Sequence, residues 1–146
     1  MKKYLKERDL WWPVSPKLMA SYRDGSHTEV WQDGTLLWIK NRVSHRDGDK
    51  PAAIYAEGTL GWYKNDELHR DGDKPAWITA AGTLEWCKNG LRHRTIGPAV
   101  IYSNKKKEYW INGVDITEEV NSWLKTRKYK APFTPEQQVE FALTFG

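Results

Sequence analysis

The chain has 146 residues, and its 23 Lys and Arg against 19 Asp and Glu give a formal net charge of +4. This length favours one domain with a modest core, and the mild basic balance permits an anionic partner without requiring one. The lone Cys87 excludes an intramolecular disulfide framework and favours a reducing compartment.

Residues 1–20 are expected to form an N-terminal cap. Residues 1–9 hold no apolar run that could act as a signal peptide, and no later stretch reaches the length of a membrane span. We therefore expect a cytoplasmic protein that does not associate with membranes. Trp11, Trp12 and Pro13 are placed to cover the open edge of the first repeat.

Residues 21–113 are built from a unit of about 24 residues that is repeated four times. The copies of its two halves are the segments 45–52 and 69–76, and the segments 34–41, 58–65 and 82–89. A fourth, shorter copy runs from 93 to 113. A fixed period of this length predicts an array of supersecondary units, each burying its apolar face against its neighbours.

Each unit reads as strand, turn, strand. Residues 51–56 form one short extended run, a turn follows at 57–58, and residues 59–64 form a second run before another turn at 65–66. Alternating side chains and the Gly, Asn and Asp residues at the breaks favour β-hairpins over helices.

Side chains of the repeats sort onto two faces because the strand period is two. On one face the residues hardly vary between copies, and Trp38, Trp62 and Trp86 form a ladder that is expected to be core. On the other face the aromatic residues differ from copy to copy. Residues free to diverge are the better candidates for a binding surface, and these are Tyr55, Tyr63, Trp77, Tyr102 and Trp110.

Residues 114–146 are expected to form a C-terminal helical cap. A helix start is placed at 115–118, and a stronger one at 134–137, where Thr134 precedes Pro135 and Gln137 can close a capping box. The whole chain is thus predicted to be mainly β, an elongated antiparallel array of about four hairpin units capped by short C-terminal helices.

The segment 84–93, with the pattern Leu-x-Trp-x-Lys-Asn-Gly-x-x-His, resembles MORN-type repeats. Such repeats are β-hairpin units that stack into an elongated, twisted antiparallel sheet. The His-Arg-Asp-Gly-x-x-Pro-Ala form at 45–52 is similar to a variant found in tailed phages and large DNA viruses. The resemblance implies the architecture and a viral type of source, whereas the lipid binding linked to some MORN arrays is not carried over.

The repeated polar residues do not predict catalysis, a metal site or a cofactor. His45, His69 and His93 lie one per unit, and units of two strands are about 10 Å apart, too far for shared zinc ligands. The segment 45–49 lacks the ligand series of a calcium loop, and no nucleophile elbow, phosphate loop or zinc-protease motif is present. We therefore expect a protein that is not an enzyme.

Two interpretations remain open for the repeated arginines. Arg46 and Arg70 can pair with Asp47, with Asp71 or with acidic residues of a neighbouring repeat. Alternatively, they form a basic ladder open to phosphate. With Lys105 in a basic cluster and the variable aromatic residues, they complete the candidate ligand-binding set.

The function hypothesis is a non-catalytic binding protein of phage or viral type. Its expected partner is a host protein, such as a defence factor, or a nucleotide-like signal, since aromatic rings stack on bases and cations meet phosphates. The alternative is a structural interaction scaffold, such as a homo-dimer or larger homo-oligomer, with no small-molecule ligand. Nucleic acid ranks last as a partner because the repeats are close to neutral.

Overall fold

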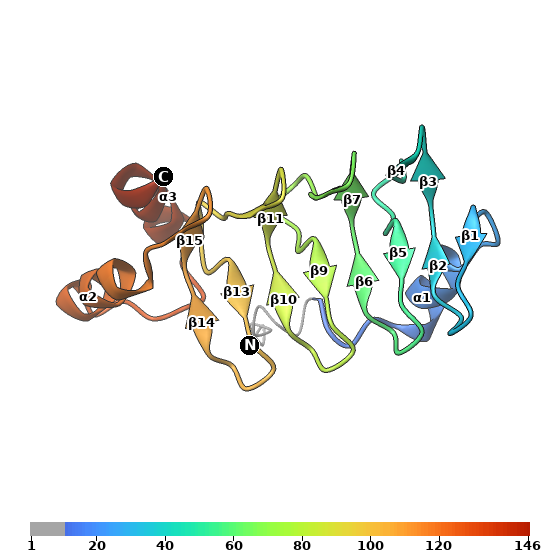
Figure 1. Cartoon of the computed structure of the whole chain (residues 1–146). Helices are drawn as coiled ribbons and strands as arrows, with labels where there is room; N and C mark the ends of the chain where they lie inside the picture. The colour runs from blue at the N-terminus through green and yellow to red at the C-terminus, as the bar shows by residue number, and fades with distance from the viewer. Residues whose placement is uncertain (1–10) are drawn as a thin grey trace.

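The structure is a computed structural model that describes residues 11–146. An eight-stranded antiparallel sheet runs along the molecule, with one short helix near its first strands and two helices at the C-terminal end (Figure 1). The predicted fold class is confirmed. The part of the expected N-terminal cap that comprises residues 1–10 lies outside the described residues.

The repeats alternate between the large sheet and a small hairpin. The large sheet contains, in order, β1 (Glu29–Val30), β2 (Leu36–Leu37), β5 (Ala53–Ile54), β6 (Leu60–Gly61), β9 (Trp77–Ile78), β10 (Leu84–Glu85), β13 (Val100–Ile101) and β14 (Lys107–Glu108). The hairpins are β3 (Ile39–Lys40) with β4 (Val43–Ser44), β7 (Tyr63–Lys64) with β8 (Glu67–Leu68), β11 (Cys87–Lys88) with β12 (Leu91–Arg92), and β15 (Trp110–Ile111) with β16 (Val114–Asp115).

The second extended run of each unit is divided at its tryptophan, which the sequence did not predict. The backbone N–H of Trp62 donates to the carbonyl of Ala76, just before β9 of the large sheet, whereas the Trp62 carbonyl accepts from His69, just after β8 of the small hairpin. The chain therefore leaves the large sheet after β6 and enters the hairpin of β7 and β8. The same exchange occurs at Trp38 and Trp86.

One face of the sheet, which we call the inner face, carries the core. The repeated isoleucines Ile54, Ile78 and Ile101 are 0 to 4% exposed. The tryptophan ladder of Trp38, Trp62 and Trp86 is likewise 2 to 5% exposed, so its prediction as core is confirmed. Equivalent residues pack against equivalent neighbours, which is why these positions vary so little between copies.

The N-terminal segment packs on the inner face rather than over the edge of the first repeat. Helix α1 (Pro16–Tyr22) begins after Ser15, whose hydroxyl accepts from the backbone N–H of Leu18. Tyr22 meets the Trp62 ring edge to face, and the Trp11 ring lies 5.5 Å from the Arg70 guanidinium. The apolar surface of the tryptophan ladder, rather than the polar backbone edge of β1, receives these aromatic residues.

The C-terminal segment completes the last repeat with helices α2 (Thr117–Arg127) and α3 (Pro135–Phe145). Thr134 and Gln137 form the capping box that the sequence predicts. Tyr109 stands where the other repeats have the ladder tryptophan, and it is 2% exposed beneath Phe133 and Phe141. The segment thus builds a second core on the end of the array.

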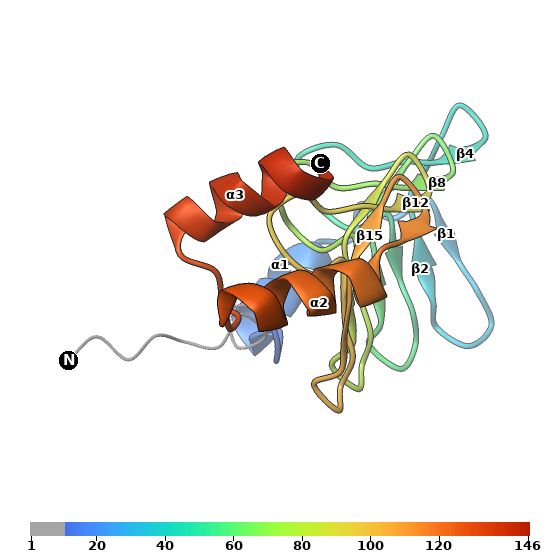
Figure 2. The ribbon, with the colours of Figure 1, turned by 90° about the vertical axis from the view of Figure 1, so that its left-hand side faces the viewer.

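All three helices lie on the same side of the sheet (Figure 2). The opposite face, which we call the outer face, carries no helix from residues 11–146. Within this described part, none of the helices is long and apolar enough to cross a membrane.

Candidate functional site

Three arginines, one in each of the last three repeats, stack on the ladder tryptophans. The guanidinium carbons lie 3.7 Å from the ring centre for Arg46 on Trp38, 3.8 Å for Arg70 on Trp62, and 4.0 Å for Arg94 on Trp86. Each of these side chains is only 6% exposed. They are therefore part of the interior of the molecule.

Each stacked arginine also joins two repeats, as Arg70 illustrates. Its Nε donates to Oδ1 of Asp49 in the preceding loop at 2.8 Å, and its Nη1 donates to the Pro75 carbonyl of its own loop at 3.0 Å. Lys74 reaches the same Asp49 carboxylate at 2.7 Å. Burial opposes ionisation of Asp49, but these hydrogen bonds outweigh it and lower the pKa of the carboxyl.

We call this arrangement the arginine clamp, and its members are the pairs Asp24–Arg46, Asp49–Arg70 and Asp73–Arg94. Arg46 and Arg70 thus pair with acidic residues of a neighbouring repeat, which was one of the two interpretations, and they do not form an open basic ladder. Asp47 and Asp71, the alternative partners, lie elsewhere. Because the clamp consumes the guanidinium donors, neither arginine is presented to a phosphate.

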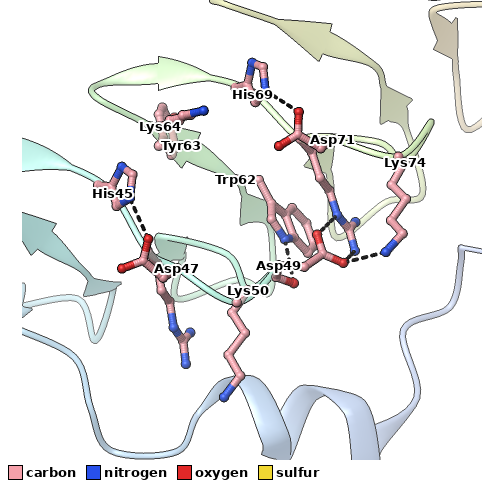
Figure 3. Close-up of a pocket in the computed structure, with 14 residues that line it drawn as sticks. His45, Asp47, Asp49, Lys50, Trp62, Tyr63, Lys64, His69, Asp71 and Lys74 are labelled. Atoms are coloured by element: carbon pink, nitrogen blue, oxygen red, sulfur yellow. Dashed lines mark hydrogen bonds and ion pairs between the residues drawn. The ribbon is translucent and has the colours of Figure 1, made fainter.

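The loops carrying the clamp border a shallow hollow of about 420 Å³ between the second and third units (Figure 3). Here His45 and His69 contact Asp47 and Asp71 through Nε2, at 2.9 and 2.8 Å. The Nδ1 of His69 accepts the backbone N–H of Asn89 at 3.1 Å, so the ring hydrogen resides on Nε2. His69 is thus a structural link between two repeats rather than a free base.

The lining of the hollow includes five Lys or Arg and three Asp residues, and most of them are paired. Lys50 and Lys74 point to aspartates of the clamp, and Asp47 and Asp71 are held by histidines. Within residues 11–146, no group of three His, Cys, Asp or Glu side chains is placed to hold a metal ion. Most of the charge around the hollow is therefore paired, and Lys64 is an exposed cation in its lining.

On the outer face, three of the predicted site residues meet around Gly61. Tyr55 and Trp77 are in edge-to-face contact at 5.5 Å, and the Tyr55 and Tyr63 hydroxyls lie 3.4 Å apart. A Cβ at position 61 would come within 2.7 Å of the Tyr63 ring and 3.1 Å of the Trp77 ring. The rings can therefore pack against the backbone of the sheet only because residue 61 is glycine. We call Tyr55, Tyr63 and Trp77 the aromatic patch.

The other two predicted aromatic residues belong to a charged cluster in the third and fourth units. Tyr102 Oη and Trp110 Nε1 donate to the two carboxylate oxygens of Glu108, at 3.2 and 3.0 Å. Arg92 bridges from Glu85 at 3.0 Å towards Glu108 at 3.8 Å. We call Glu85, Arg92, Tyr102, Glu108 and Trp110 the charged patch.

The two patches are adjoining parts of one surface. Trp77 and Glu85 are directly opposite each other on β9 and β10, and Glu85 and Glu108 flank Val100 on β13. The five predicted aromatic residues are half-buried and none packs in the core of the terminal helices. Sequence reasoning missed Glu85, Arg92 and Glu108, although their strand positions place them on the variable face.

Lys105 lies in the turn between β13 and β14, where its backbone N–H donates to the carbonyl of Tyr102 at 2.8 Å. Its φ of +72° is left-handed, and the equivalent position is glycine in the other three repeats, Gly34, Gly58 and Gly82. All four turns share the same backbone hydrogen bond from this residue to the third residue before it. The turn thus fixes the backbone of Lys105, and its side chain is exposed.

We expect Lys105→Gly to raise the free energy of unfolding by about 0.5–1 kcal/mol, because a lysine in a left-handed conformation is strained and glycine is not. Chemical denaturation followed by circular dichroism measures this change. Ser103→Gly in the same turn is the control, since Ser103 is outside the left-handed region and glycine there should be neutral or destabilising. A loss of stability in Lys105→Gly would contradict the assigned turn.

Cys87 occupies the outer-face position that Tyr63 has in the preceding repeat, but it is only 5% exposed. Burial, followed by the charge of Glu85, raises the pKa of the thiol to about 12. The side chain is therefore a protonated, buried thiol near neutral pH rather than a thiolate nucleophile.

Comparison of this chain with protein-family models, with curated proteins and with solved structures gave no match.

Proposed function

We propose that this chain is a non-catalytic binding scaffold whose outer face engages a partner protein. The observation that carries the proposal is an aromatic patch adjoining a charged patch on the face that the helices leave uncovered. Aromatic residues and arginine are the residue types that contribute most at protein interfaces. If the chain is of phage or viral type, as its repeats imply, the partner is a host protein.

A protein partner fits this surface better than a nucleotide-like signal does. Phosphates need cations that are free to form bonds, but Arg46 and Arg70 are held in the clamp and Arg92 lies between two carboxylates. The aromatic patch supplies apolar area, and the charged patch supplies both signs within hydrogen-bonding reach. Mixed charges beside apolar area match the composition of a second protein surface.

The rings of the aromatic patch are rigid, which favours binding. Tyr63 is packed against the backbone at Gly61 and hydrogen-bonded to Tyr55, and Trp77 is braced by Tyr55. The rings are already held in place in the free protein. A partner that covers them therefore causes little further loss of side-chain entropy, and less entropy opposes binding.

We expect Trp77→Ala to weaken the partner complex by about 2 kcal/mol, or roughly 30-fold, because an aromatic residue at the centre of an interface is a typical hot spot. The partner is first captured from lysate of the natural host cells with the wild-type chain. Its affinity for the wild type and for Trp77→Ala and Arg92→Ala is then measured by titration calorimetry. Thermal melting of each variant shows that it is folded.

Leu143→Ala is the matched control, since Leu143 is an exposed apolar residue on α3, away from the outer face. The control should bind like the wild type. Full affinity in both outer-face variants, or loss of affinity in Leu143→Ala alone, would contradict the proposed surface. A rise in melting temperature with nucleotides and no captured protein would favour the nucleotide-like ligand instead.

A further inference from the structure

The first strand of the large sheet has an edge that no strand within residues 11–146 fills. β1 pairs with β2 on one side, and no strand among residues 11–146 pairs with its other side. Val30 is 57% exposed and the adjoining Trp31 is 51% exposed. Two large apolar side chains are therefore in solvent beside free backbone groups, a combination that templates further strand pairing.

The repeats show what is missing at this edge. Val30 stands at the position of Ile54, Ile78 and Ile101, which are each paired with a leucine of the preceding repeat. These isoleucines are at most 4% exposed, in contrast with Val30. The edge of β1 is thus a repeat-to-repeat interface that lacks one of its two sides.

The free backbone groups on this edge belong to Val30. The neighbouring Trp31 N–H donates to the carbonyl of Thr35, the residue just before β2, at 2.9 Å. Because the residues of an antiparallel strand alternate between the two neighbours, the N–H and C=O of Val30 point away from β2.

The opposite end of the sheet is closed to a strand from another molecule. Lys107 on β14 replaces the leucine that would pair with a following isoleucine, and an edge lysine opposes pairing. Beyond it, the Tyr109 N–H donates to Thr117 Oγ1, and its carbonyl accepts from Ile116. The Tyr109 N–H is the group that would bind a next repeat, as the Trp86 N–H binds the Ala99 carbonyl, so its bond to Thr117 opposes extension of the array head to tail.

We propose that a second copy of this chain pairs with β1, with the two β1 strands antiparallel about a two-fold axis through Val30. Both copies then contribute the same edge, which gives a closed dimer rather than a filament. On the inner face, Val30 of one copy lies opposite Val30 of the other. Within the array, a leucine of the preceding repeat lies opposite each equivalent isoleucine. On the outer face Glu29 lies opposite Trp31 of the other copy, so the two glutamates are not directly opposed.

The contact is short, and we expect a weak dimer that forms with increasing concentration. Light scattering over a concentration series should show the wild type rising from the mass of one chain towards that of two. Val30→Pro removes an N–H that β2 does not use, and proline is tolerated at such an edge position. The two-fold axis doubles the loss of the hydrogen bond, so dimerisation should weaken about 30-fold while the monomer melts as before.

A cysteine at the axis locates the contact directly. In a hydrogen-bonded antiparallel pair the Cα atoms are about 5.5 Å apart, within the range of a disulfide, so Val30→Cys should cross-link on mild oxidation. The native Cys87 is buried and does not compete. Leu143→Cys is the control, because Leu143 is 83% exposed on α3 and should cross-link only by random collision.

Three outcomes would overturn the proposal. They are a wild type that stays monomeric at its highest soluble concentration, a Val30→Pro variant that dimerises like the wild type, and a Leu143→Cys variant that cross-links as fast as Val30→Cys. Each of these is independent of whether the outer face captures a partner protein.

Discussion

Trp62→Ala is expected to lower the free energy of unfolding by about 3–5 kcal/mol, the largest loss for any single change considered for this chain. The Trp62 ring is 3% exposed, and its Nε1 donates to the Asp49 carbonyl at 3.2 Å. Arg70 stacks on one side of the ring and Tyr22 meets it edge to face. The substitution therefore leaves a cavity where two repeats and helix α1 come together.

Urea denaturation followed by far-ultraviolet circular dichroism measures the loss. Trp31→Ala is the matched control, because Trp31 is half-exposed at the first turn, and its loss should change stability by less than about 0.5 kcal/mol in the monomer. Equal losses in the two variants would show that the tryptophan ladder is not the core of the array.

Arg70→Ala is expected to lower the free energy of unfolding by about 2–3 kcal/mol. Breaking a fully buried ion pair costs more, about 3–5 kcal/mol, but the Asp49 side chain is 43% exposed and water can solvate it when Arg70 is removed. The substitution also removes the packing on Trp62 and the donor to the Pro75 carbonyl. For a chain of this length, each kcal/mol corresponds to a fall in melting temperature of about 2–4 °C.

A double-mutant cycle separates the ion pair from the stacking. Asp49→Ala and Arg70→Ala together should show a coupling energy of about 1–2 kcal/mol, since they remove the same interaction. Arg70→Lys keeps the charge but cannot stack flat on the indole while bonding the carboxylate, and it should recover less than half of the loss. Lys64→Ala, an exposed cation outside the clamp, is the control. Strict additivity of Asp49→Ala and Arg70→Ala would contradict the clamp.

The large-scale fold could be predicted because it is encoded by repetition. A period of 24 residues and strand alternation predicted the hairpins, and the positions that do not vary predicted the core, including Trp62. The start of α3 could be predicted because its capping residues are local, with Thr134 and Gln137 three residues apart. Each of these signals lies within one unit or one helical turn.

The features that could not be predicted depend on contacts between distant positions. Arg70 has acidic residues next to it in the chain, yet its partner is Asp49, 21 residues earlier, and only the stacking of repeats makes that choice. Glu85 and Arg92 resemble ordinary surface residues until β10 and β12 bring them together with Glu108. The course of Trp11 across the inner face likewise depends on apolar area that exists only after the repeats have stacked.

The arginine clamp also bears on how many units this chain can contain. Each pair of the clamp requires an aspartate that accepts from the arginine of the following repeat. The loops that hold Asp24, Asp49 and Asp73 supply one aspartate each. The last loop has Thr-Ile-Gly at 95–97 where the two loops before it have Asp-Gly-Asp-Lys, at 47–50 and 71–74. Thr117 stands where a further arginine would come. The last loop therefore has no aspartate for a further arginine, and the series of clamp pairs ends at Asp73 and Arg94.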